Sequence, residues 1–197
     1  MRLAVFGGAF DPFHAGHLAV IRELLARDLC DRVLVVPAAR SPLKPPSQAS
    51  ADDRLAMVRI GIAGLAAVEV WDGELARPGP SRTVDTLEAL AALHPRDELR
   101  LVLGEDAWRD LGAWHRPQRV RELALPVVLA RDGRAPDPRE LPPGAAVLAD
   151  FAVPGASSDI RAKLHAGQPP ESLLPPAIAA YVRERRLYGC GKDDPCR

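Results

Sequence analysis

The sequence has no excess of charge of either sign. Lysine plus arginine and aspartate plus glutamate each number 26 in a chain of 197 residues, so the formal net charge is zero. A protein that binds a long polyanion needs a broad positive field, which this balance does not supply. We therefore expect no nucleic-acid partner. A local cluster of cations in one cleft remains compatible with overall neutrality.

Cysteine and long apolar runs are also scarce. The three cysteines, at positions 30, 190 and 196, are odd in number and do not suggest the disulfide framework of a small secreted domain. The chain starts with a strand-like run rather than with the charged and apolar regions of a secretory signal. No run reaches the roughly 18 apolar residues of a membrane span. We expect a cytoplasmic protein with no membrane partner.

Neither common glycine-rich phosphate motif, G-x-x-x-x-G-K-[ST] or G-x-G-x-x-G, occurs in the chain. Instead, the segment Gly7-Gly8-Ala9-Phe10-Asp11-Pro12-Phe13-His14-Ala15-Gly16-His17 follows the apolar run Leu3–Phe6 and precedes an amphipathic helical pattern. The order strand, glycine turn, helix places backbone N–H groups at the carboxyl edge of a sheet, where phosphates bind. If helical, His14 and His17 share one face and donate toward the same anion, and Gly16 allows close approach.

Three other interpretations of the two histidines stay open at this point. They are two core histidines, a metal pair with Asp11, and a turn that matches by chance.

Apolar runs alternate with helical patterns along the chain. Strands are predicted at residues 3–6, 32–36, 67–71, 98–103 and 126–130. Helical patterns start near Leu18 and Leu55, cover Thr83–Leu93, and start again at Ala156 and at Pro175. Continuous apolar strands that alternate with helices indicate a doubly wound, mainly parallel α/β sheet. We expect a single domain over residues 1–188 and a disordered tail over residues 189–197.

Five further residues, in three segments, have side chains suited to binding a ligand. Ser157 and Ser158 are ordinary N-cap residues, and Arg161 adds a cation one turn into the same helix. Lys44, in the loop after the second predicted strand, fits a phosphate contact and a solvated position equally well. Trp114 is followed by polar residues, which favours the edge of a cleft over the core.

Together these segments resemble the nicotinate-mononucleotide adenylyltransferases, a family of the H-x-G-H nucleotidyltransferase superfamily. The first segment is similar to G-G-x-F-D-P-x-H-x-G-H, residues 74–87 to E-x-x-R-x-G-P-S-Y-T-x-x-T-L, and residues 156–161 to I-S-S-T-x-I-R. Gly104 and Asp106, followed by Trp114, are similar to the G-x-D and tryptophan of the family. The resemblance extends from Leu3 to Tyr188. The chain departs from the pattern at Ala9, Leu43 and Arg82.

The resemblance implies a Rossmann-like nucleotidyltransferase fold and an enzyme of NAD biosynthesis. Its partners are ATP and nicotinate mononucleotide, and its products are nicotinate adenine dinucleotide and pyrophosphate. Mg²⁺ is implied as the partner of ATP, with no metal ligand from a protein side chain.

The resemblance also implies the site residues. Catalysis is assigned to His14, His17 and Arg161. ATP binding is assigned to Gly7, Gly8, Ala9, Phe10, His14, His17, Gly104, Asp106, Ser157, Ser158, Ile160 and Arg161. Mononucleotide binding is assigned to Asp11, Lys44, Thr83, Trp114, His115 and Arg131.

Two alternatives remain beside this hypothesis. One is another adenylyltransferase of the superfamily, with nicotinamide mononucleotide or pantetheine phosphate as acceptor. The other is a nucleotide sensor without catalytic activity. The features at Thr83 and Trp114 favour the pyridine acid as acceptor.

Overall fold

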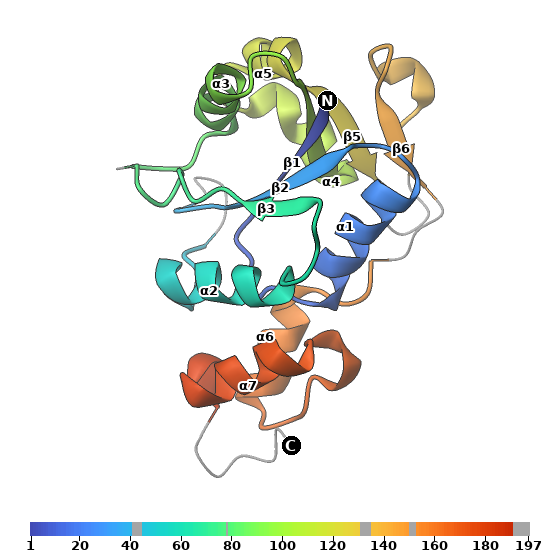
Figure 1. Ribbon diagram of the computed structural model, residues 1–197. Helices are drawn as coiled ribbons and strands as arrows, with labels where there is room; N and C mark the ends of the chain where they lie inside the picture. The colour runs from blue at the N-terminus through green and yellow to red at the C-terminus, as the bar shows by residue number, and fades with distance from the viewer. Residues whose placement is uncertain (41–44, 78, 131–134, 150–152, 191–197) are drawn as a thin grey trace.

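A parallel sheet lies at the centre of the fold (Figure 1). The computed structural model describes residues 1–40, 45–77, 79–130, 135–149 and 153–190. Within these ranges the sheet has six strands: β1 (Arg2–Gly8), β2 (Arg32–Pro37), β3 (Val68–Val70), β4 (Glu98–Gly104), β5 (Leu125–Leu129) and β6 (Ala146–Leu148). Every neighbouring pair is parallel, and the order across the sheet is β3-β2-β1-β4-β5-β6.

Helices connect the strands, and two further α-helices come after the last strand in the chain. The α-helices are α1 (Ala15–Ala26), α2 (Ala51–Gly61), α3 (Thr83–Leu93), α4 (Glu105–Arg109), α5 (Pro117–Leu123), α6 (Ser157–His165) and α7 (Pro176–Glu184). Short 3-10 helices are η1 (Asp110–Ala113), η2 (Pro138–Glu140), η3 (Glu171–Leu173) and η4 (Leu187–Gly189). Within the described part of the chain, none of the helices combines the length and the apolar character needed to cross a bilayer.

The sheet separates two apolar cores, because successive side chains of a strand point to opposite faces. In β1, Ala4 and Phe6 face a core shared with α1, α2, α6 and α7, whereas Leu3 and Val5 face a core shared with α3, α4 and α5. The two sets of helices lie on opposite sides of the sheet in Figure 1. Strands buried on both faces explain why their sequences are continuously apolar.

The strand order reverses direction between β1 and β4. The chain adds β2 and β3 on one side of β1 and then β4, β5 and β6 on the other. In doubly wound sheets, ligands bind beyond the carboxyl ends of the strands at such a switch point. Gly8 at the end of β1 and Gly104 at the end of β4 lie at this edge.

The five predicted strands and the doubly wound α/β sheet are confirmed, as are the predicted helices that correspond to α1, α2, α3, α6 and α7. The sequence did not indicate β6, α4 or α5. These elements have three, five and seven residues, too few to show a clear hydrophobic period.

Candidate active site

His14 and His17 form a reciprocal cap at the start of α1. His14 is the N-cap residue, with extended backbone at φ −143° and ψ 175°, so it lies outside the helix. Its Nδ1 accepts a hydrogen bond from the N–H of Gly16 at 3.1 Å, and Nδ1 of His17 accepts one from the N–H of His14 at 3.2 Å. The ring centroids are 3.8 Å apart. The supposition that both residues are helical is therefore wrong for His14, and it is the cap that brings the rings together.

The cap also decides which ring nitrogen carries the proton. A backbone N–H can only donate, so each Nδ1 must be an unprotonated acceptor, and the proton of the neutral ring lies on Nε2. His17 packs against the rings of Phe10 and Phe13 at centroid distances of 4.9 and 5.3 Å, which restricts its rotation. Both imidazoles are thus oriented with Nε2–H as a hydrogen-bond donor.

Of the other interpretations of this pair, the metal site receives no support. Among the described residues there is no group of three or more His, Cys, Asp or Glu side chains placed to hold a metal ion. His14 is only 3% exposed, as a core residue would be. The reciprocal polar cap nevertheless orients its ring, which apolar packing alone does not do.

Two glycines in this motif are needed for close packing. A Cβ at Gly16 would lie 2.5 Å from the carbonyl oxygen of Pro154, so the segment that leads into α6 rests directly on the start of α1. A Cβ at Gly8 would lie 3.0 Å from the ring of Phe10. The predicted close approach at Gly16 is therefore an approach by the chain itself.

The start of α6 lies beside the loop of residues 9–14 between β1 and α1, which we call the site loop. Ser157 Oγ donates to the carbonyl oxygen of Pro12 at 3.2 Å, and Arg161 Nη1 donates to the carbonyl oxygen of Asp11 at 2.7 Å. The N-cap of α6, Ala156, makes no side-chain cap bond. The first N–H groups of α6 therefore depend on other acceptors, and such a helix start favours anions.

The remaining residues predicted to bind ATP lie around the same elements. Gly7 and Gly8 end β1, and Ala9 and Phe10 begin the site loop. Ile160, in α6, is buried in the core shared by α1, α2, α6 and α7. Ser158 is exposed, and its hydroxyl donates to Asp159 Oδ1 at 3.2 Å. The structure thus brings the glycine motif and the serine–arginine motif together, although about 145 residues separate them.

Asp11 connects the site loop to three other segments of the chain. Its Oδ2 accepts from the N–H of Gln48 at 2.8 Å, and its Oδ1 accepts from the N–H of Ala49 at 3.1 Å and from the hydroxyl of Tyr188 at 2.7 Å. The Arg161 guanidinium lies 3.9 Å from the same carboxylate. Asp11 is 4% exposed, and in this structure its side chain fixes the position of the site loop. Its contact with the mononucleotide stays a prediction.

Arg54 is a buried residue of the site that the sequence analysis missed. Only 1% exposed, it donates from Nη1 to the carbonyl oxygens of Ala9 at 2.7 Å and Ala38 at 2.8 Å. It thereby joins the site loop to the end of β2. Burial lowers the pKa of Arg54, while attraction to the Asp11 carboxylate opposes that shift. The spacing in the sequence could have indicated this burial. Arg54 lies three residues before Met57 and four before Val58, and therefore on the apolar face of α2.

The motif before α3 forms a polar network. Thr86 Oγ1 donates to Glu74 Oε1 at 2.5 Å, and Arg77 Nη2 donates to Thr86 Oγ1 at 3.0 Å. Ser81 Oγ accepts from the N–H of Ala39 at 2.8 Å, which binds the loop to the end of β2. These bonds hold the first residue of α3, Thr83, at the same edge of the sheet as the site loop.

Four more of the predicted site residues lie at the end of β4 or after it: Gly104 and Asp106, predicted to bind ATP, and Trp114 and His115, predicted to bind the mononucleotide. Gly104 is the N-cap of α4 and Asp106 lies in its first turn. Trp114 is half-buried against the core shared by α3, α4 and α5, and His115 is exposed.

The neighbouring residue Arg116 connects this segment to α3. It forms an ion pair with Glu88 at 3.1 Å, on the side of the sheet that also carries Thr83. Lys44 and Arg131, the two remaining predicted residues, lie outside the described residues, as does Leu43.

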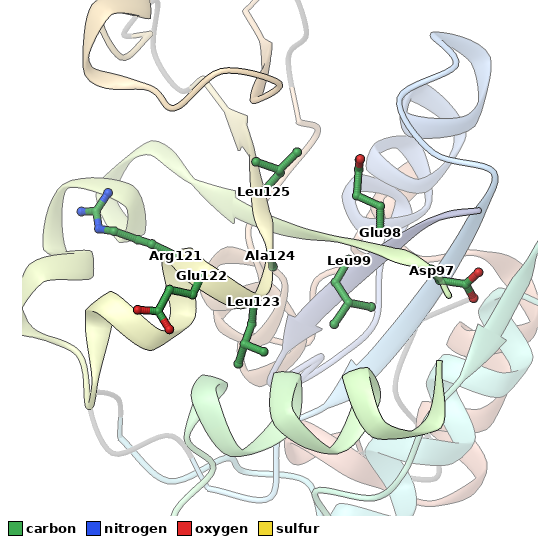
Figure 2. Close-up of a pocket in the computed structure, with 8 residues that line it drawn as sticks. All are labelled: Asp97, Glu98, Leu99, Arg121, Glu122, Leu123, Ala124 and Leu125. Carbon is green, nitrogen blue, oxygen red and sulfur yellow. The ribbon is translucent and has the colours of Figure 1, made fainter. Parts of the chain in front are cut away.

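A separate hollow of about 180 Å³ lies at the opposite edge of the sheet (Figure 2). It is lined by Asp97, Glu98, Leu99, Arg121, Glu122, Leu123, Ala124 and Leu125, at the amino ends of β4 and β5. Its charged groups have partners: Glu98 pairs with Arg100, Glu122 with Arg119, and Arg121 lies over the ring of Trp108. This hollow is remote from the residues of the two phosphate motifs.

Comparisons with known proteins show the family to which the chain belongs. The sequence model of the cytidylyltransferase-like family matches residues 5–163. A protein of Chlorobaculum parvum described as a "probable nicotinate-nucleotide adenylyltransferase" is 40% identical over 200 residues, covering 95% of this chain and 99% of the relative.

Two solved structures share the fold. Both are of a nicotinic acid mononucleotide adenylyltransferase of Plasmodium falciparum, 18% identical to this chain, and each match covers 98% of this chain and 99% of the other. The structure complexed with APC superimposes with a TM-score of 0.79, and the one complexed with NaAD with a TM-score of 0.76. At this level of identity the likeness concerns the fold.

Proposed function

The chain belongs to the nicotinate-nucleotide adenylyltransferases, within the cytidylyltransferase-like family, and we propose that it transfers the adenylyl group of ATP to nicotinate mononucleotide. The products are nicotinate adenine dinucleotide and pyrophosphate, in the synthesis of NAD. The observation that carries the proposal is the paired histidine cap beside the start of α6, where Arg161 meets the site loop at 2.7 Å. This is a set of hydrogen-bond donors gathered at the switch point of the sheet.

The reaction needs no covalent nucleophile from the protein. A phosphate oxygen of the mononucleotide attacks the α-phosphorus of ATP, the bond to the bridging oxygen breaks, and pyrophosphate leaves. The protein accelerates such an in-line transfer by positioning the reactants and by stabilising the charge of the transition state. The Nε2–H groups of His14 and His17 supply that stabilisation at the α-phosphate.

The start of α6 serves the outgoing phosphates. Ser157, Ser158 and the first N–H groups of α6 lie at the positive end of the helix dipole, which favours the binding of anions. Arg161 adds a full charge one turn later. Gly7, Gly8 and the site loop then pass beneath the nucleotide, and Gly104 and Asp106 lie toward its ribose.

The mononucleotide lies toward α3 and the segment after β4. The N–H groups at the start of α3, near Thr83, receive the pyridine carboxylate, and the ring of Trp114 stacks on the pyridine. His115, Lys44, Arg131 and Asp11 complete this half of the site in the proposal. A carboxylate acceptor suits a helix start, which explains a preference for the acid over the amide.

A panel of acceptors tests the proposed function. With ATP and Mg²⁺, we expect rapid pyrophosphate release with nicotinate mononucleotide, slower release with nicotinamide mononucleotide, and none with pantetheine phosphate. An equal or higher kcat/KM with either of the other two acceptors would assign the chain to that substrate instead. Tight ATP binding without release for any acceptor would identify a nucleotide sensor.

Mg²⁺ is the proposed partner of ATP, held by phosphates and water. The donor set fits this mode, because both oxygens of the Asp11 carboxylate accept hydrogen bonds from the protein and the described residues contain no cluster of metal-ligating side chains. When bound, the ion neutralises charge on the phosphates.

We expect EDTA to abolish pyrophosphate release and an excess of Mg²⁺ to restore it. The midpoint of thermal unfolding without nucleotide should stay unchanged in EDTA, since in this proposal the phosphates of ATP, and not the fold, hold the ion. Full activity in EDTA would contradict the role of the metal, and a large fall in the unfolding temperature would indicate a structural ion.

We also propose that the protein works in the cytoplasm without nucleic acid as a partner. Cys30 is a buried free thiol, and burial raises its pKa to about 11, which makes it unreactive. Free thiols fit a reducing compartment.

A further inference from the structure

The last described segment of the chain reaches back to the site loop. Tyr188 lies in η4, after α7, and its hydroxyl donates to Asp11 Oδ1 at 2.7 Å across 177 residues of sequence. The side chain is 5% exposed. In Figure 1 the helices of this C-terminal part lie below α1 and α2, on the side where the chain enters α1. Tyr188 therefore connects this C-terminal part of the chain to the site loop.

Asp11 receives this bond as part of a larger set. The same carboxylate accepts from the N–H groups of Gln48 and Ala49, and the carbonyl oxygen of Asp11 accepts from Arg161. The carboxylate and the main chain of Asp11 are thus both fixed from outside the site loop. Only two residues separate Asp11 from His14, so the position of Asp11 sets the entry into the histidine cap.

The hydrogen bond between Tyr188 and Asp11 joins two segments that each contain a residue with a strained, left-handed backbone conformation. Phe10, which precedes Asp11, has φ 51°, and Tyr188 has φ 57°. Bulky residues rarely adopt the left-handed region, and they stay there only where the surrounding contacts determine them. Phe10 is held by packing against His17 and Phe13. At Tyr188, the bond to Asp11 is the polar contact that holds the side chain.

We propose that Tyr188 is a positioning residue of the active site, which acts through Asp11 to hold the site loop and the histidine cap in the geometry for transfer. The inference rests on the proposed adenylyl transfer, but it adds a residue outside the four motifs of the site. It also assigns a role to the C-terminal segment, because removal of the Tyr188 hydroxyl releases Asp11 and thereby alters the position of His14 and His17.

The chemistry of the pair keeps the bond in place. Burial and the hydrogen bond to Asp11 raise the pKa of the Tyr188 phenol, whereas the charges of Arg161 and Arg54 oppose that rise. The phenol therefore stays protonated and remains a donor at any pH at which the enzyme is assayed.

The chain offers a matched control. Tyr181 donates to Asp53 Oδ1 at 2.9 Å, so it too is a tyrosine bonded to a buried carboxylate in the C-terminal part of the fold. That bond joins α7 to the first turn of α2 and does not touch the site loop. Tyr181→Phe and Tyr188→Phe each remove one hydroxyl and one tyrosine–aspartate bond.

The test compares the two variants in steady-state kinetics at a temperature well below unfolding. Misplacement of catalytic groups acts on kcat, so we expect Tyr188→Phe to lower kcat about tenfold with little change in KM for ATP. Tyr181→Phe should keep kcat within about twofold of wild type, although it removes a comparable bond. Equal kcat for Tyr188→Phe and wild type would overturn the proposal, as would equal losses in both variants.

Hydrogen exchange of the peptide that covers residues 9–17 provides a readout that does not depend on activity. Exchange should speed up in Tyr188→Phe and not in Tyr181→Phe, and unchanged exchange in both would overturn the link between Tyr188 and the site loop. If wild type releases no pyrophosphate with any acceptor, the proposed function fails. The exchange result alone then decides whether Tyr188 holds the loop.

Discussion

Replacement of His17 by alanine is expected to lower kcat by about 10²–10³-fold, the usual cost of losing one donor to a charged transition state. The KM for ATP should change far less, because the contact strengthens as charge develops at the α-phosphate. The structure supports this role, since Nδ1 of His17 is engaged as an acceptor by the N–H of His14 and the donor proton therefore lies on Nε2.

The capping role of His17 has to be separated from catalysis. In His17→Asn, the amide oxygen takes the place of Nδ1 and still accepts from the N–H of His14, but no group replaces Nε2. We expect this variant to recover the stability that His17→Ala loses, about 1 kcal/mol for a helix cap, without recovering kcat.

His94→Ala serves as the control for the loss of an imidazole. His94 is the C-cap residue of α3, and its ring lies 3.4 Å from Asp97, at the opposite edge of the sheet. It should leave kcat unchanged. Near wild-type turnover in His17→Ala, or restored turnover in His17→Asn, would contradict a catalytic role for His17.

Replacement of Asp11 by alanine is expected to destabilise the protein by about 3–5 kcal/mol, as the loss of one partner from a buried charged group does. Two N–H groups, at Gln48 and Ala49, and the hydroxyl of Tyr188 would lose their acceptor. The buried guanidinium of Arg54 would also lose a neighbouring negative charge. Unpaired buried donors and charges account for effects of this size.

The measurement is the free energy of unfolding from denaturant titration, accompanied by the thermal midpoint. For a chain of this size the expected loss corresponds to a fall of about 6–20 °C. Asp52→Ala is the control, because Asp52 is exposed in the first turn of α2 and contributes about 0.3–1 kcal/mol through the helix dipole. Equal stability of Asp11→Ala and Asp52→Ala would show that Asp11 does not hold the scaffold.

Residue types and their spacing predict only part of the geometry around His14 and His17. The strand, glycine turn and helix around His14 and His17 were predictable, because an apolar run, a turn sequence and a helical stripe are all local patterns. That His14 caps α1 was not predictable from spacing, since a three-residue separation fits both a helical face and a cap. The cap geometry is what assigns the proton to Nε2.

The contacts of Arg54 and Tyr188 with the site could not be predicted from the sequence. Arginine on a helix and tyrosine near a chain end have ordinary local explanations, and nothing in their neighbours in sequence points to the site loop. Their partners are Ala9, Ala38 and Asp11, between 16 and 177 residues away. Long-range hydrogen bonds of this kind exist only after the sheet and both helical layers have formed.

The sequence by itself determined five of the six described strands, five of the seven described α-helices, the parallel sheet, and the edge at which the phosphate motifs collect. It could do so because hydrophobic period and turn chemistry act over a few residues. Only the tertiary structure decided how the two histidine rings are oriented, that the start of α6 rests on the site loop, and that Asp11 is shared by three segments. These features depend on which buried donor meets which buried acceptor, and packing of the whole chain selects those partners.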